Sequence, residues 1–113
     1  MAKIIKIPSV FVYESKVVGV SQKNDNGSLR QEIIAAEVNE GDKLRLETEE
    51  NNRYDPNAIK VLSPRGNQIG YLNREMALKI RPALISGTES IVTVIWVNGD
   101  KMLGVGVRIE LIS

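Results

Sequence analysis

The sequence predicts a mainly β fold, a small partly closed antiparallel barrel of the OB-like or SH3-like type with one or two short helices inserted. Three observations favour this fold class. Short runs rich in β-branched residues are separated by turn signals. Helical periodicity is clear in one segment only, so strands and helices do not alternate as they do around a parallel sheet. The length of 113 residues, with 42% hydrophobic residues, suits a single domain spanning residues 1–113.

The expected strands alternate apolar and polar residues or are continuously β-branched. They cover residues 10–20, 43–47, 58–62, 69–72, 91–97 and 103–112. Leu44 and Leu46 should face the core, and Trp96 is expected in the core rather than on a stacking surface. The Asn98-Gly99 pair predicts a type I′ hairpin turn, because both residues tolerate positive φ.

One helix is expected between the strands. Asn73 is its N-cap, and the carboxylate of Glu75 in the first turn suits the helix dipole. Pro82 should kink the segment or begin a second short helix, and Gly87 should end it. Residues 30–38 fit either a helical turn or a strand. The expected buried stripe of the helix is Met76, Ile80 and Leu84.

Composition excludes several kinds of chemistry. Cysteine and histidine are both absent, so disulfides, thiolate catalysis and Ser-His-Asp arrangements cannot occur. No Gly-x-x-x-x-Gly-Lys-Ser/Thr loop is present, so the chain is not a P-loop ATPase. We therefore expect a protein that is not an enzyme and needs no metal or cofactor.

Charge and hydropathy set further limits. The formal net charge is +1, whereas proteins that coat long duplex DNA are usually far more basic. No apolar run approaches the roughly 20 residues of a membrane-spanning helix. Residues 1–6 lack the apolar region of a secretory signal. These features predict an intracellular, cytoplasmic protein that does not bind membranes and that touches few phosphates if it binds nucleic acid.

The most specific pattern lies between residues 41 and 72. Residues 52–61 read Asn-Arg-Tyr-Asp-Pro-Asn-Ala-Ile-Lys-Val, residues 69–72 read Ile-Gly-Tyr-Leu, and the upstream residues 17–20 read Val-Val-Gly-Val. This ordered set resembles the HIRAN family over roughly residues 10–87. The resemblance implies a modified barrel fold. In eukaryotic members the domain is fused to helicase-like DNA-remodelling ATPases and grips the 3′ end of a single DNA strand.

The resemblance also implies a set of binding residues. Tyr54 and Asp55 match the family's central Tyr-Asp pair, and Arg74 falls at the position of a phosphate-contacting lysine. Tyr71 is expected to line the same pocket, and basic Arg53 is adjacent to the pair. A tyrosine ring can stack on a base, and a carboxylate can accept a hydrogen bond from a 3′-hydroxyl while repelling a phosphate.

Each of these residues also has a purely structural interpretation. Asp55-Pro56-Asn57 is a good type I turn, so Asp55 can simply cap it and Tyr54 can pack on it. Arg74 can be a solvated helix residue, and Tyr71 can be half-buried barrel wall. The amides of Asn52 and Asn57 are expected to satisfy loop backbone groups.

The sequence departs from the family pattern after residue 20. The best-understood members have an arginine and an aromatic residue there, whereas this chain has Ser21 and Gln22. One phosphate contact and one stacking face are therefore missing. The candidates to replace them are Tyr13, Lys16, Lys23 and Arg53.

The function expected from these observations is a module that recognises single-stranded DNA, at its 3′-hydroxyl end, in DNA repair or replication-fork processing. The alternative is a protein–protein adaptor that recruits a DNA-processing machine such as a helicase or nuclease. A third hypothesis is a Mg²⁺-dependent nuclease whose oxygen ligands would be Glu47, Glu49, Glu50 and Asp55.

Overall fold

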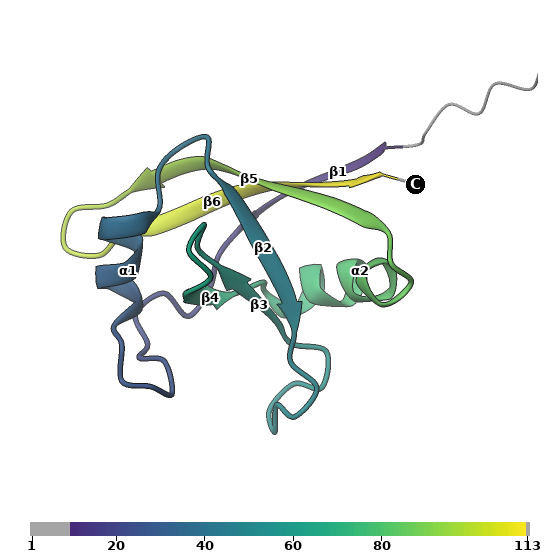
Figure 1. The fold of residues 1–113 in the computed structure, drawn as a ribbon, viewed down its shortest axis with the longest axis horizontal. Helices are drawn as coiled ribbons and strands as arrows, with labels where there is room; N and C mark the ends of the chain where they lie inside the picture. Colours follow the sequence, from purple (N-terminus) through teal and green to yellow (C-terminus); the bar gives the residue numbers. More distant parts are fainter. Residues whose placement is uncertain (1–9, 113) are drawn as a thin grey trace, which may run out of the picture.

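A computed structural model describes residues 10–112, so the expectation drawn from residues 1–6 lies outside the described part of the chain. Within it, six strands and two helices follow one another along the sequence (Figure 1). They are β1 (Val10–Lys16), α1 (Arg30–Glu37), β2 (Lys43–Thr48), β3 (Ile59–Leu62), β4 (Gln68–Tyr71), α2 (Arg74–Ile85), β5 (Glu89–Asn98) and β6 (Gly104–Ile112).

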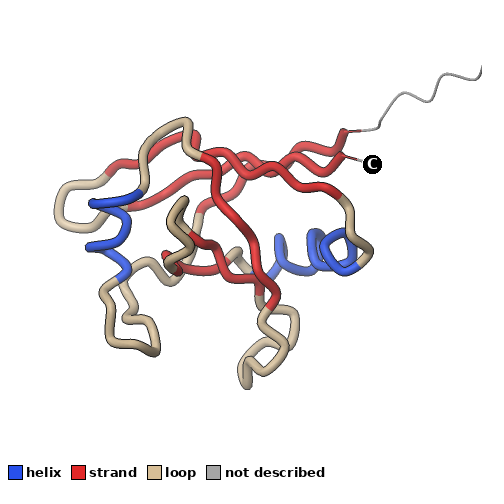
Figure 2. The backbone as a smooth tube through the Cα atoms, viewed as in Figure 1, coloured by secondary structure: helices blue, strands red, loops and turns tan. Residues whose placement is uncertain are grey.

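All six strands belong to one antiparallel sheet with the order β1-β6-β5-β2-β3-β4. Strand β2 turns the sheet, because its first residues Lys43 and Leu44 pair with β5 and its remaining residues pair with β3. The sheet therefore curls into a half-barrel, with the long strands β1, β6 and β5 on one side and the short strands β3 and β4 on the other (Figure 2). The predicted fold class is confirmed.

The core lies between the two sides of this curled sheet and is almost entirely aliphatic. The helices contribute Ile33 and Ile34 from α1 and Ala77 and Ile80 from α2. The strands contribute Leu44, Ile59, Val61, Ile69, Val92, Val94, Val105, Val107, Ile109 and Leu111. Leu46 is only partly buried and packs at the margin of this cluster.

Helix α2 differs from its predicted pattern in two respects. Its buried residues are Ala77 and Ile80, whereas Met76 and Leu84 are partly buried beside them. The predicted stripe therefore does face the core, but only Ile80 of its three residues is fully buried, because the centre of the face that meets the core passes through Ala77. The helix also continues past Pro82 to Ile85 as one element. Gly87 follows its end with a φ of 80°.

The first predicted strand ends earlier than the sequence suggested. β1 stops at Lys16, the Val17 N–H bonds to the Val105 carbonyl, and Val18 then pairs with Tyr71 of β4 instead of with β6. Gly19 follows with a φ of 73°. The chain therefore crosses from one side of the half-barrel to the other within three residues, and residues 17–20 do not extend the strand.

The hairpin between β5 and β6 is not the predicted type I′ turn. Asn98 is the last residue of β5 and pairs with Gly104, so the connection runs over residues 99–103. Among the described residues only glycines have positive φ, which excludes Asn98 from a type I′ geometry. Trp96 is half-buried, with its indole packed against Gly104 and Gly106.

The ambiguous segment 30–38 forms helix α1, and its last residue connects it to the β3–β4 turn. Glu37 accepts hydrogen bonds from the Ser63 hydroxyl (2.7 Å) and from the Asn67 amide (2.9 and 3.0 Å). These two donors, with Arg65 as a further positive charge, lower the pKa of Glu37 below its ordinary value. Ser63 is fully buried, so Glu37 also satisfies a hydroxyl that water cannot reach.

Gly70 is the residue of β4 that the loop between β1 and α1 approaches most closely. A Cβ at this position would lie 2.7 Å from Val17 Cγ1 and would collide with the Val18 carbonyl oxygen. We expect Gly70→Ala to lower the free energy of unfolding by about 1–3 kcal/mol, as overpacking of a core does. Gly104→Ala is the control, because its Cβ would meet only side-chain atoms at 3.3 Å or more. Equal urea midpoints for the two variants would contradict this account.

Glu37 should make stability depend on pH. Its folded pKa lies below the unfolded value, so its contribution is present above the unfolded pKa and is lost as pH falls through the folded pKa. Between about pH 6 and about pH 3, we expect the unfolding free energy of the wild type to fall more steeply than that of Glu37→Gln. Urea titrations at several pH values test this, and parallel curves would show that the carboxylate contributes nothing.

Candidate nucleic-acid interface

A pocket of about 330 Å³ opens between the β2–β3 loop, the end of β4 and the start of α2. It collects four of the five binding residues expected from the sequence, namely Tyr54, Asp55, Tyr71 and Arg74. Arg53 is exposed and is not part of the lining. The remaining lining residues are Val18, Asn52, Ala58 and Leu72.

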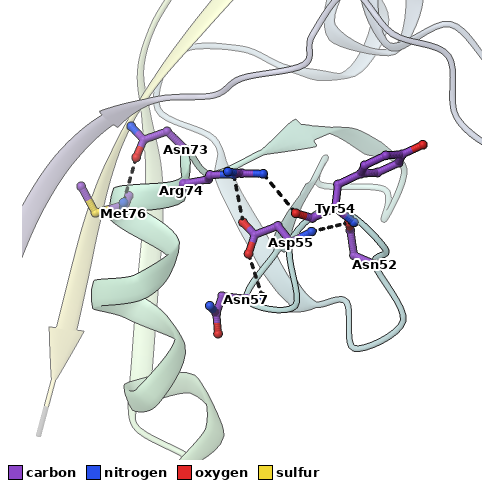
Figure 3. Close-up of polar contacts among 7 residues, drawn as sticks. All are labelled: Asn52, Tyr54, Asp55, Asn57, Asn73, Arg74 and Met76. Atoms are coloured by element: carbon purple, nitrogen blue, oxygen red, sulfur yellow. Dashed lines mark hydrogen bonds and ion pairs between the residues drawn. The ribbon is translucent and has the colours of Figure 1, made fainter.

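The loop that carries Tyr54 and Asp55 is ordered by its own side chains. Asn52 Oδ1 accepts the backbone N–H groups of Tyr54 (2.8 Å) and Asp55 (2.9 Å), and Asp55 Oδ1 accepts the N–H of Asn57 (2.9 Å) (Figure 3). The structural interpretation of Asn52 is therefore confirmed. Asn57 takes part through its backbone N–H, and the caps of this loop come from Asn52 and Asp55.

Tyr54 is held by its backbone while its side chain stays free. The side chain extends away from the Asp55–Arg74 contact (Figure 3), and the residue is 85% exposed. The expectation that Tyr54 might pack on the turn is therefore wrong. A large apolar ring with no protein partner, at the edge of a pocket, is available to a ligand.

Arg74 connects the start of α2 to this loop. The preceding Asn73 caps the helix as predicted, with Oδ1 accepting the Met76 N–H at 2.8 Å. One Arg74 Nη donates to the Tyr54 carbonyl (3.0 Å), and Nε lies 3.9 Å from Asp55 Oδ2. The Arg74 side chain is 77% exposed and the Asp55 side chain 19%. Such a long, solvated ion pair contributes little to stability. Because the side chain is largely exposed, most of the guanidinium faces solvent.

Tyr71 forms the wall of the pocket, and two residues whose role here the sequence did not predict hold it in place. Its hydroxyl donates to Glu49 Oε2 at 2.6 Å. The guanidinium carbon of Arg30 lies 5.3 Å from the centre of its ring, within the range of a cation–π contact. Tyr71 is half-buried, as the structural interpretation expected. The sequence suggests Glu49 only as an oxygen ligand for Mg²⁺.

Arg30 is a buried cation that connects the segments behind Tyr71. It is 6% exposed, its Nε donates to Asn24 Oδ1 (2.8 Å), and its Nη1 donates to the Gly19 carbonyl (2.8 Å). None of the ion pairs among residues 10–112 involves it. Arg30 joins the turn at Gly19, the loop at Asn24 and the ring of Tyr71. The sequence did not predict these contacts, since they join segments that are 6 to 41 positions apart in the chain.

The residues proposed to replace the missing arginine and aromatic lie elsewhere. Ser21, Gln22 and Lys23 are exposed on the loop after Gly19, and none of them lines the pocket. Lys16 and Arg53 are also absent from the lining. Tyr13 lies in a separate groove of about 280 Å³ together with Phe11 and Pro82.

Neither a metal site nor a membrane-spanning helix is found in the described part of the chain. Within residues 10–112, no three acidic side chains come together in a way that could hold a metal ion. Glu49, one of the acids considered as a ligand, is bonded to the Tyr71 hydroxyl. In the same part of the chain, neither the length nor the hydrophobicity of any helix is sufficient for crossing a membrane.

Solved structures with this fold include two close in shape. The HIRAN domain of human helicase-like transcription factor superposes with a TM-score of 0.74 at 22% identity, covering 94% of this chain and 79% of that one. A protein from Lactobacillus plantarum superposes with a TM-score of 0.76 at 19% identity, covering 94% and 98%. At these identities the likeness is one of fold.

Sequence relatives cover a shorter stretch. Helicase-like transcription factor of Oryctolagus cuniculus is 43% identical over 56 residues, and that of Homo sapiens is 41% identical over 56 residues. Each match covers 45% of this chain and 6% of the relative, so the chain corresponds to a small part of those proteins. The model of the HIRAN domain matches residues 10–111. The chain therefore belongs to the HIRAN family.

Proposed function

We propose that this chain is a single binding domain, spanning residues 1–113, that recognises the 3′-hydroxyl end of single-stranded DNA in the pocket described above. The observation that carries the proposal is that the exposed Tyr54, the carboxylate of Asp55 and the guanidinium of Arg74 line one pocket. These three groups offer a stacking face, a hydroxyl acceptor and a phosphate donor. They match the terminal base, the 3′-hydroxyl and the preceding phosphate of a strand end.

The terminal base is placed on Tyr54. Base–aromatic stacking contributes about 1–3 kcal/mol per base and tolerates any base, because every base has a flat face. The backbone of Tyr54 is fixed by Asn52, so little ordering is needed when the base binds. The pocket is therefore suited to an end of any sequence.

Asp55 is the group that distinguishes a hydroxyl end from a phosphate end. One of its oxygens already accepts the Asn57 N–H, and the other faces Arg74 at 3.9 Å. A carboxylate has about four acceptor positions, so a 3′-hydroxyl can still donate to it. A 3′-phosphate would bring negative charge against the carboxylate and would be repelled.

Arg74 is placed to contact the phosphate that precedes the terminal nucleotide. Its guanidinium is largely exposed, and it stands at the N-terminus of α2, where backbone N–H groups favour anions. With a net charge of +1, the domain suits few phosphate contacts. Two contacts would give a salt slope of about −1.4 for a single strand.

The proposed biological setting follows from the relatives, which are named helicase-like transcription factors. We infer that the domain acts in DNA repair or replication-fork processing and delivers a strand end to a helicase or nuclease partner. No residue of this chain needs to carry out a reaction in that role.

A second function, protein–protein adaptor, is favoured by one observation. β1 is an edge strand of the sheet, and Val10, Phe11 and Val12 are 50–58% exposed along it. Exposed apolar edge strands can be extended by a strand from a partner. If the pocket binds neither kind of strand end, Val12→Lys becomes the variant with which to test the adaptor role, by measuring its effect on binding to a purified candidate helicase or nuclease.

Asp55→Asn should remove end discrimination without removing binding. The asparagine oxygen can still accept the Asn57 N–H, so the loop should remain folded, while the charge is lost. We expect the wild type to bind a 3′-hydroxyl strand about tenfold or more tightly than its 3′-phosphate counterpart, given about 1.5–3 kcal/mol for a charge-assisted hydrogen bond. In Asp55→Asn the two affinities should approach one another in fluorescence anisotropy. An unchanged preference in the variant would remove Asp55 from the site.

Tyr54→Ala should weaken the binding of 3′-hydroxyl strands and of 3′-phosphate strands to the same degree. Loss of one stacked base corresponds to a decrease of about 5- to 150-fold in affinity. Tyr54→Phe keeps the ring and is the matched control, with affinity close to that of the wild type. Because Tyr54 is 85% exposed, neither change should shift thermal unfolding. Wild-type affinity in Tyr54→Ala would rule out stacking on this ring.

A further inference from the structure

A second depression adjoins the pocket on the same face of the sheet. This polar cleft of about 250 Å³ is formed by loop residues 24–26, by Lys60 of β3 and by residues 66–68 at the β3–β4 turn. Lys60 pairs directly with Tyr71, which lines the pocket. Directly opposed residues share one face of a sheet, with Cβ atoms about 4.5–5.5 Å apart. Lys60 therefore stands at the boundary between the pocket and the polar cleft.

The walls of the polar cleft are fixed by hydrogen bonds. The Asn24 amide donates to the Gln68 carbonyl at 2.9 Å, and its oxygen accepts the Nε of Arg30 at 2.8 Å. On the other side, the Asn67 amide is held by Glu37 at 2.9 and 3.0 Å. A site whose walls are already ordered loses little conformational entropy when a ligand binds.

The charges around Lys60 leave it available to an anion. Lys60 is half-buried, and the ion pairs among residues 10–112 do not include it. Glu47 of β2 is directly opposite Lys60 and shares its face of the sheet, as Tyr71 of β4 does on the other side, but the ion pairs among these residues do not include Glu47. Within the cleft, the exposed carboxylate of Asp25 disfavours a phosphate, whereas the otherwise neutral polar lining suits bases and sugars. The cleft and Lys60 thus complement different parts of a nucleotide.

We propose that Lys60 and the polar cleft form a second subsite for the nucleotides on the 5′ side of the bound end. The second phosphate from the 3′ end contacts the Lys60 ammonium, and the following base and sugar occupy the cleft. This inference rests on the proposed function, and it gives the strand a direction, from Tyr54 past Tyr71 to Lys60. It also supplies a phosphate contact for a chain that has Ser21 and Gln22 where relatives have an arginine and an aromatic.

The test is a competition series with unlabelled oligothymidylates of about two to six nucleotides ending in a 3′-hydroxyl, displacing a labelled strand. Wild-type affinity should rise when the competitor gains its second internal phosphate. Lys60→Gln should lose that gain, about fivefold at about 0.1 M salt, and its salt slope should be shallower by about 0.7. Its affinity for the dinucleotide should not change.

Two controls separate the subsite from general charge and from folding. Lys101→Gln removes the same charge from the exposed β5–β6 loop and should leave both the length series and the salt slope unchanged. Lys60→Arg should restore both. If the wild type shows no dependence on length, or if Lys60→Gln keeps the same dependence as the wild type, while the 3′-hydroxyl preference persists, the subsite is wrong and the proposed function stands. If Asp55→Asn leaves end discrimination intact, the proposed function fails by a separate measurement.

Discussion

The pocket depends on one backbone contact between segments that are far apart in the sequence. Val18 and Tyr71 exchange two hydrogen bonds, of 2.8 and 2.9 Å. They lie at the point where the loop that follows β1 separates from β6 and meets β4. Only glycine at position 70 allows this approach, because a Cβ would strike Val17 and Val18. The contact closes the open side of the half-barrel, and it places Val18 and Tyr71 together in the wall of the pocket.

The two sides of the pocket are built by different means. On the side that carries Tyr54, Asp55 and Arg74, the loop and the helix start are each built locally, since each hydrogen bond within the loop spans two or three residues and the N-cap of α2 spans three. Arg74 joins the two, by its hydrogen bond to the Tyr54 carbonyl. The side that carries Tyr71 is non-local, since Glu49 lies 22 residues away from it in the sequence. A substitution on the first side should therefore act directly on the proposed binding of a strand end. A substitution on the second side should act on it by disturbing the fold.

The positive charge of the site is distributed unusually. Arg74 is exposed at the mouth of the pocket, while Arg30 is buried behind the ring of Tyr71 and is satisfied by neutral oxygens. The charge of a buried guanidinium is screened less than that of a solvated one, so its field extends further. The pocket therefore has a positive potential although the net charge of the chain is only +1.

The sequence by itself determined the fold class and the local parts of the site. The turn at Asn52 and Asp55, the N-cap at Asn73 and the strand alternation were readable because each depends on residues within a few positions of one another. Only the tertiary structure decided the early end of β1, the longer hairpin after Asn98 and the roles of Arg30 and Glu49. These depend on which segments meet across the half-barrel, and no local pattern of residues specifies a contact between distant segments.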